Sequence, residues 1–255
     1  MSGSTKAIWH DVECGSYDAD LPLWEELAER CGGPILELGC GTGRVSLFLA
    51  RRGHQVIGLD QDQELLDALA ERAADSLHTR VGRKSDASDG VAVEPVHADA
   101  QAFELAEEVG LVLAPTHLLQ LLPDSARRIE CLRCIAAALR PGGLLAAAII
   151  ESMPEPDGAP PPLPDVREVD GWVYSSLAIE AAVGPGEIVV RRLRQLVSPE
   201  GSLSEEPNEV RIATFTAEAL EAEAAICGLV PAGRREIPPT TMHEGSLVVL
   251  LERSA

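Results

Sequence analysis

The pattern of apolar and polar positions in the first 150 residues alternates between short apolar runs and longer amphipathic segments. The apolar runs have the length of β-strands and occupy residues 34–38, 54–60, 91–100, 109–117 and 139–150. Apolar residues recur three or four positions apart in residues 42–52, 62–77 and 124–139. Strands that alternate with helices in this way form parallel sheets with helices on both faces. The pattern therefore predicts an α/β fold with a doubly wound, mostly parallel sheet.

The pattern changes after residue 153. Six prolines fall among residues 154–164, too many for a helix or a central strand, so a stiff, extended connection is expected there. Strand-like segments follow at 166–180, 187–197 and 208–215. They predict an antiparallel β meander inserted after the fifth strand of the core.

The two ends of the chain add further elements to the predicted core. Leu23 and Leu27 share the apolar face of a predicted helix that stops at Gly32, and Thr216 is the expected N-cap of another. The predicted parts are a helical leader with a lid (1–33), the core (34–153), the proline-rich linker with the meander (154–215), and a helix with the last two strands (216–255).

Charge and cysteine usage restrict the class of partner. Arginine and lysine total 21 against 41 acidic residues, a net charge of −20, whereas nucleic-acid enzymes present basic surfaces to phosphates. An acidic field favours cationic substrates such as amines, or it serves solubility alone. No apolar run has the length of a membrane span, and no secretory leader is evident. The six scattered cysteines show no metal-binding spacing. We expect a cytoplasmic protein with no nucleic-acid, membrane or metal partner.

The chemistry-bearing part of the sequence begins at the end of the first predicted strand. Glu37, Gly39, Gly41 and Gly43 stand at alternate positions before a helix. Glycines there omit the Cβ atoms that keep a ligand away from the backbone, and a helix N-terminus presents amide N–H groups to it. A dinucleotide fingerprint needs a further glycine at position 44, and this chain has Arg44.

A second acidic position strengthens the case for a nucleoside ligand. Asp60 ends the second predicted strand, 21 positions after Gly39, which suits a carboxylate that binds the two hydroxyls of a ribose. The alternative is that Asp60 caps the following helix, although Asp62 is also available for that. Gln61 is included with Asp60 in the predicted site.

These motifs resemble those of the class I S-adenosylmethionine-dependent methyltransferases that act on small molecules. The stretch from Glu37 to Gly43 resembles their motif I, and Asp99-Ala100 resembles the pair that meets the adenine ring. Residues 109–117 resemble their fourth strand, and residues 139–150, with Pro141-Gly142-Gly143, their fifth. The matches run in order over roughly residues 34–151.

The resemblance implies a Rossmann-like, seven-stranded sheet and S-adenosyl-L-methionine as cofactor, with S-adenosyl-L-homocysteine as product. In this family a Tyr-Asp pair ahead of the first core strand belongs to a lid, which makes Tyr17 a candidate, although packing of the leader is an alternative role. The cofactor-binding residues that the resemblance implies are Tyr17, Glu37, Gly39, Cys40, Gly41, Gly43, Asp60, Gln61, Asp99, Ala100 and Pro115.

Methyl transfer from a sulfonium is an in-line displacement that needs no metal, and a neutral amine acceptor needs no strong base. A hydroxyl or carbon acceptor must lose a proton, and His117 is the candidate base, with a packing role as the alternative. The expected function is methyl transfer to N, O or C of a small-molecule acceptor. A non-catalytic protein that binds the cofactor is the alternative. The meander is expected to be an acceptor lid and a possible homodimer interface, or a purely structural extension.

Overall fold

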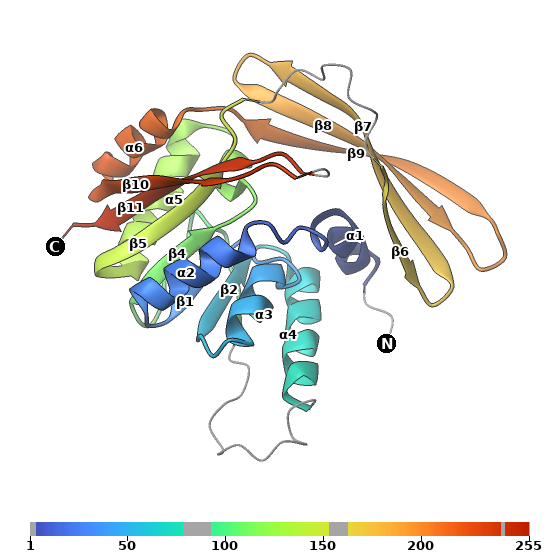
Figure 1. The fold of residues 1–255 in the computed structure, drawn as a ribbon, viewed down its shortest axis with the longest axis horizontal. Coiled ribbons are helices and arrows are strands. Elements are labelled where there is room, and N and C mark those ends of the chain that lie inside the picture. Colours follow the sequence, from blue (N-terminus) through green and yellow to red (C-terminus); the bar gives the residue numbers. More distant parts are fainter. Residues whose placement is uncertain (1–3, 79–92, 153–162, 241–242, 255) are drawn as a thin grey trace.

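The computed structural model describes residues 4–78, 93–152, 163–240 and 243–254. These residues form a seven-stranded sheet and a four-stranded sheet, with helices packed on the larger one (Figure 1). The order of the larger sheet is β10-β11-β5-β4-β1-β2-β3, and that of the smaller is β6-β7-β8-β9. The predicted α/β, Rossmann-like fold with an inserted antiparallel meander is confirmed.

The strands of the larger sheet are β1 (Ile35–Leu38), β2 (Val56–Asp60), β3 (Val93–His97), β4 (Val109–Ala114), β5 (Leu139–Ile149), β10 (Leu229–Ile237) and β11 (Ser246–Arg253). The first five are parallel to one another, and β11 runs antiparallel to β5 and β10. The carboxyl ends of β1, β2, β4 and β5 therefore meet at one edge, where open α/β sheets bind their ligands. The edge position of β3 explains Pro95, which would break the hydrogen bonds of a central strand.

Helices cover both faces of the larger sheet and bury its apolar side chains. They are α2 (Leu21–Cys31), α3 (Arg44–Ala50) and α4 (Gln63–His78) on one face, and α5 (Ser125–Ala138) and α6 (Ala217–Ile226) on the other. Leu27, Leu49 and Leu69 are fully buried on the first face, and Leu132 and Leu220 on the second. Each such leucine contributes roughly 1.5–3 kcal/mol to the free energy of folding. No helix among the described residues is long and apolar enough to cross a membrane.

The leader contains a second helix that the apolar spacing does not predict. Helix α1 (Thr5–Cys14) begins at Ser4, whose hydroxyl accepts a hydrogen bond from the Ala7 N–H at 3.2 Å. Its buried face includes Trp9 and the charged Asp11 beside aliphatic residues. A carboxylate on the inner face interrupts the hydrophobic period, which is why the pattern does not reveal this helix.

The meander has one strand more than predicted. Its strands are β6 (Asp165–Val169), β7 (Trp172–Gly184), β8 (Glu187–Val197) and β9 (Leu203–Ala213). The expectation of one strand over 166–180 is wrong, because Asp170 and Gly171 both have positive φ angles, of 51° and 81°, and form a tight hairpin turn. Most of the predicted proline-rich linker lies outside the described residues.

An aromatic contact and a hydrogen-bonded glutamine are among the contacts that attach the meander to the rest of the molecule. Trp9 of α1 packs edge-on against Tyr174 of β7, with ring centroids 5.0 Å apart. At the base, the buried Gln120 side chain donates to the carbonyl oxygens of Ile150 and Ala213, at 2.9 and 2.6 Å. These contacts hold the meander beside the carboxyl edge of the larger sheet.

One carboxyl group is fully enclosed in the core. Glu37 of β1 is 2% exposed and accepts a hydrogen bond from the Ser46 hydroxyl of α3. Burial raises the pKa of Glu37 from 4.5 to about 7, although the bond from Ser46 acts in the opposite direction. The folded protein therefore holds a proton on Glu37 at pH values where the unfolded chain has released it.

Replacement of Glu37 by glutamine tests this assignment through the pH dependence of stability. Glu37 costs no stability below about pH 4.5, and its cost grows as the pH rises through about 7. The difference between the pKa values of Glu37 in the folded and the unfolded protein corresponds to about 3 kcal/mol in the free energy of unfolding. We expect urea unfolding to show that Glu37→Gln gains stability relative to the wild type between pH 5 and pH 8.5. An equal free-energy difference at both pH values would contradict the assignment, and Glu104→Gln on the surface is the control.

Candidate active site

The glycine turn between β1 and α3 is tightly packed by the protein's own side chains. Gly39, Gly41 and Gly43 have φ angles of 64°, 53° and 90°, a conformation that other residues rarely adopt. A Cβ atom at Gly39 would lie 2.6 Å from Leu118, and one at Gly41 would lie 2.3 Å from His10. Neighbouring side chains occupy the space that the missing Cβ atoms leave, and the approach of a ligand to the turn stays a prediction.

The amide groups of the turn are also engaged within the protein. The Gly41 N–H donates to Asp60 Oδ2 at 2.8 Å, and the Gly43 N–H donates to the Cys40 carbonyl oxygen at 2.9 Å. The prediction that these two amides point at a ligand is wrong. Their bonds hold the turn against the end of β2, so that the turn and Asp60 form one rigid corner of the site.

Asp60 remains able to bind a ligand. Its side chain is partly exposed, and its oxygens accept from the N–H groups of Gly41 and Asp62. Asp62 in turn accepts from the Glu64 N–H at 3.0 Å, so Asp62 caps the first turn of α4. A carboxylate has about four acceptor positions. Asp60 therefore has capacity left for the hydroxyls of a ribose.

The remaining predicted cofactor residues differ in how far they reach solvent. Asp99 and Gln61 are exposed on the rim, where Asp99 Oδ1 accepts from the Gln101 N–H at 2.9 Å, and Ala100 lies next to Asp99. Cys40 and Pro115 are buried. Glu37 lies beneath the turn, bonded to α3, and so supports the turn from below instead of lining its surface.

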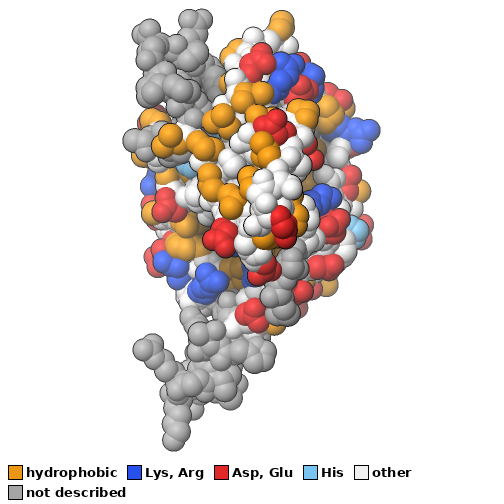
Figure 2. Space-filling model, turned by 90° about the vertical axis from the view of Figure 1, so that its right-hand side faces the viewer, with side chains coloured by type: hydrophobic (Ala, Val, Ile, Leu, Met, Phe, Trp, Pro, Cys, Tyr) orange, Lys and Arg blue, Asp and Glu red, His pale blue; other side chains and the backbone are white. Residues whose placement is uncertain are grey.

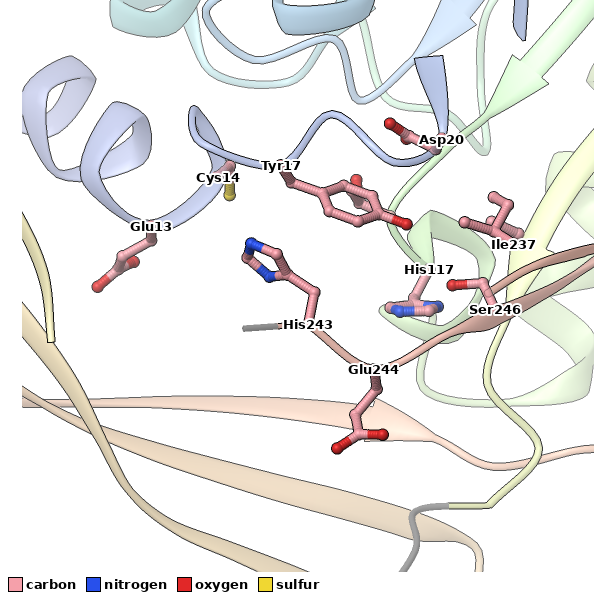
Figure 3. A pocket seen from close by; sticks show the side chains of 11 residues that line it. Glu13, Cys14, Tyr17, Asp20, His117, Ile237, His243, Glu244 and Ser246 are labelled. Atoms are coloured by element: carbon pink, nitrogen blue, oxygen red, sulfur yellow. The ribbon is translucent and has the colours of Figure 1, made fainter. Parts of the chain in front are cut away.

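A cavity of about 190 Å³ opens where the leader meets the ends of β4 and β5 and the turn between β10 and β11 (Figure 3), and of the predicted site residues Tyr17 and His117 line it. In Figure 3 the rings of Tyr17, His117 and His243 face one another across it. Tyr17 and His243 pack edge-on with centroids 4.9 Å apart. The residues that line the cavity are Glu13, Cys14, Tyr17, Asp20, Thr116, His117, Ala148, Ile237, His243, Glu244 and Ser246. No lysine or arginine is among them.

His117 follows β4 in an unusual backbone conformation. Thr116 and His117 both have positive φ angles, of 49° and 64°, which non-glycine residues adopt at a cost of roughly 1–3 kcal/mol each. Nδ1 of His117 is buried and has no hydrogen-bond partner among the described residues. Burial lowers the pKa of His117 to about 4, so the ring is neutral near pH 7. The site thus holds an uncharged imidazole with an unused polar atom.

Arg44 positions the other side of the cavity, and the sequence motifs do not identify this role. Its guanidinium binds the buried carboxylate of Asp20 with two bonds of 2.6 and 2.7 Å and donates to the Tyr17 carbonyl oxygen at 2.8 Å. Burial raises the pKa of the Tyr17 phenol to about 12, so Tyr17 stays protonated. Arg44, which stands where a dinucleotide fingerprint has its last glycine, therefore ties the Tyr17 backbone to the start of α3.

Two carboxylates of α1 connect the site to the meander. The sequence pattern identifies neither, because it does not predict the helix on which they lie. Asp11 accepts from the Thr42 hydroxyl at 2.7 Å, from both Nη atoms of Arg72, and from Arg167 of β6 at 2.7 Å. Glu13 accepts two bonds of 2.8 Å from Arg194 of β8. Helix α1 therefore lies between the glycine turn and the meander and is bonded to both.

These observations fit the cofactor that the resemblance implies. Two carboxylates with free acceptor capacity, Asp60 and Asp99, follow neighbouring strands, while the cavity is lined by other residues, among them Thr116 and His117 after β4. Such a cleft suits a nucleoside on one side and a charged tail with an acceptor on the other. Within the described residues, no group of three or more His, Cys, Asp or Glu side chains is arranged to hold a metal ion.

Comparison with known proteins agrees with this arrangement. Residues 35–143 match the model of a methyltransferase domain. The chain is 30% identical over 149 residues to a ubiquinone biosynthesis O-methyltransferase of Psychrobacter arcticus, which covers 58% of this chain and 52% of the relative. It is 28% identical over 177 residues to the 27-O-demethylrifamycin SV methyltransferase of Amycolatopsis mediterranei, which covers 68% and 60%. The chain thus spans about half to three fifths of the length of these relatives.

Structural similarity extends over the whole chain. The sugar N-methyltransferase KedS8 from Streptoalloteichus superimposes with a TM-score of 0.72 at 16% identity, over 100% of this chain and 95% of that one. A match at this level of identity establishes the fold, and the match of residues 35–143 establishes the domain. The core of the chain belongs to the class I S-adenosylmethionine-dependent methyltransferases.

Proposed function

We propose that the protein transfers a methyl group from S-adenosyl-L-methionine to an amine nitrogen of a small-molecule acceptor held in the cavity beside Tyr17 and His117. The observation that carries this proposal is the neutral His117 ring, with its unpartnered Nδ1, in a cavity without lysine or arginine. When bound, the cofactor supplies an electrophilic methyl group. The protein binds both molecules and aligns them.

The residues on the cofactor side bind and orient. Asp60 accepts the ribose hydroxyls, and Asp99-Ala100 lies where the adenine ring would be placed by the family resemblance. Charge-assisted hydrogen bonds of this kind contribute roughly 1.5–3 kcal/mol each. The bonds from Gly41 and Asp62 fix the Asp60 carboxylate before any ligand arrives, so little ordering is required at binding.

The residues on the acceptor side favour nitrogen. An amine attacks in its neutral form, and its alignment with the methyl group can provide most of the rate enhancement. His117, with a pKa of about 4, is a weak base, but it accepts a hydrogen bond from an acceptor N–H. Glu13 and Glu244 point from the cavity toward the strands of the meander (Figure 3). Because Glu13 is already paired with Arg194, the carboxylate that would attract a cationic acceptor is that of Glu244.

A hydroxyl acceptor is the second candidate. The names of the two sequence relatives refer to methylation at oxygen. His243 packs against Tyr17 in the cavity, in a position to take a proton from a hydroxyl. A non-catalytic protein that binds the cofactor is a third. The activity of His117 and His243 variants separates the first two, and detection of a methylated product separates both from the third.

The meander covers the acceptor side as a lid and pairs with the meander of a second copy. Its exposed large apolar side chains are Val166, Trp172, Ile179, Val183 and Leu203. Figure 2 shows hydrophobic side chains running down this side of the molecule between charged ones. The remaining proposals are a cytoplasmic location and a substrate other than nucleic acid, which the net charge of −20 supports.

Substitution of Asp60 tests cofactor binding. Because Asp60→Asn loses the charge and part of the acceptor capacity, we expect the Kd for S-adenosylhomocysteine in titration calorimetry to rise about ten- to a hundredfold. Asp67→Asn on the exposed side of α4 is the control and keeps wild-type affinity. Absence of any heat with the wild-type protein, for both S-adenosylmethionine and S-adenosylhomocysteine, would refute the proposed function.

The pH dependence of activity identifies the acceptor atom. For an amine acceptor, kcat/KM should rise with pH along the titration of the amine itself, because His117 is already neutral above about pH 5. Two amine substrates of different pKa, found by screening aminosugars, alkylamines and phenols, should then show two different acid limbs. An acid limb at one fixed pH for every acceptor, abolished by His243→Gln, would instead assign O-methylation with His243 as base.

Light scattering after size exclusion tests the homodimer. The wild-type chain should have the mass of two copies, and Ile179→Glu with Val183→Glu should shift it to one copy, because buried charge opposes the contact. Ile226→Glu on α6, at a side chain of similar exposure (65% against 56% and 63%), is the matched control and should stay dimeric. A monomeric wild-type protein would exclude the meander as a homodimer interface.

A further inference from the structure

His10 of α1 lies against the glycine turn, although no sequence motif includes it. A Cβ atom built on Gly41 would be 2.3 Å from His10 Nε2 and 2.4 Å from Cε1. The imidazole edge therefore occupies the side-chain position that Gly41 leaves empty. The other polar neighbour of Gly41 is Asp60, which accepts the Gly41 N–H. Two hydrogen-bond acceptors thus flank a single glycine of the cofactor corner.

The hydrogen bonds around Thr42 determine which ring nitrogen of His10 carries the proton. The Thr42 hydroxyl donates its one hydrogen to Asp11 Oδ1 at 2.7 Å, so its oxygen accepts from His10 Nδ1–H at 3.2 Å. Asp11 is the charged partner: burial opposes its ionisation, but the bonds from Arg72 and Thr42 lower its pKa below the usual value. Burial lowers the pKa of His10, so the ring carries one proton at neutral pH.

Nε2 of His10 is therefore an unprotonated acceptor. It has no hydrogen-bond partner among the described residues, whereas Nδ1 is fixed by Thr42. Asp11 is held in turn by Arg72 of α4 and Arg167 of β6. The ring is consequently fixed from behind by a network that spans the core and the meander, and its free nitrogen lies at the glycine turn.

We propose that His10 Nε2 accepts a hydrogen bond from the cofactor, from a ribose hydroxyl or from the ammonium group of its amino-acid tail, and that Thr42 and Asp11 are the positioning residues that hold the ring for this contact. The proposal rests on the proposed function, because it assigns a contact within the same cofactor site. It adds a residue of α1 to the cofactor site. The other predicted residues of that site are Tyr17 and residues of the core.

Titration calorimetry with S-adenosylhomocysteine tests the contact. We expect His10→Phe, which keeps the ring and removes the acceptor, to raise the Kd about five- to tenfold. His10→Gln, whose side-chain oxygen is an acceptor of similar reach, should recover most of the affinity. His54→Phe, at the opposite end of β2, is the matched control and should bind as the wild type does.

Two further measurements distinguish the outcomes. Titration with methylthioadenosine, which lacks the amino-acid tail, shows the same loss in His10→Phe if the donor is a ribose hydroxyl and no loss if it is the ammonium group. Nitrogen NMR of histidine-labelled wild-type protein should show the Nε2 resonance of His10 move on addition of ligand, which needs no variant to fold. Wild-type affinity in His10→Phe together with an unmoved Nε2 resonance would overturn the proposal and leave the function intact. Failure of the wild type to bind would refute both.

Discussion

The buried ion pair between Arg44 and Asp20 is the interaction on which the arrangement of the site depends. Arg44 begins α3 directly after the glycine turn, and Asp20 ends the segment that carries Tyr17. Burial of two charges is costly unless their remaining hydrogen-bonding groups are satisfied. Here the pair has two short bonds, Trp24 Nε1 donates to Asp20 at 2.7 Å, and Arg44 also donates to the Tyr17 carbonyl oxygen. Tyr17 is therefore held by the same residue that follows the glycine turn.

In this strongly acidic chain, several arginines form ion pairs that join α1 to the core and to the meander. Arginines of α4, β6 and β8 are paired with the two carboxylates of α1, so that basic groups of the meander are used to hold the leader. None of them lines the cavity. The excess of acidic residues, together with the internal pairing of the arginines, keeps positively charged side chains out of the cavity lining. The same pairing makes α1 a structural link between the glycine turn and the meander.

The sequence predicts what depends on neighbouring residues and fails where distant segments meet. The order of strands and helices follows from hydrophobic period, and β8 occupies the predicted residues 187–197 because its turn chemistry is local. Helix α1 is missed because Asp11 on its inner face is stabilised by Arg72 and Arg167, which lie 61 and 156 residues away. The turn at Asp170-Gly171 is a local exception, because Asp-Gly is a hairpin signal that the prediction of one strand over 166–180 overlooks. No sequence signal indicates that His10 fills the space beside Gly41, since only the folded chain brings these two residues together.

Glu37 and Asp60 explain why two acids at the ends of adjacent strands have different roles. Glu37 pairs with Gly58 in the sheet, within β1, and its side chain is covered by α3, so its pKa rises to about 7. Asp60 is the last residue of β2, partly exposed, with two backbone N–H groups bonded to its oxygens. Those N–H bonds stabilise a carboxylate without covering it. Position relative to the strand end, more than residue type, therefore decides which acid supports the turn and which is available to a ligand.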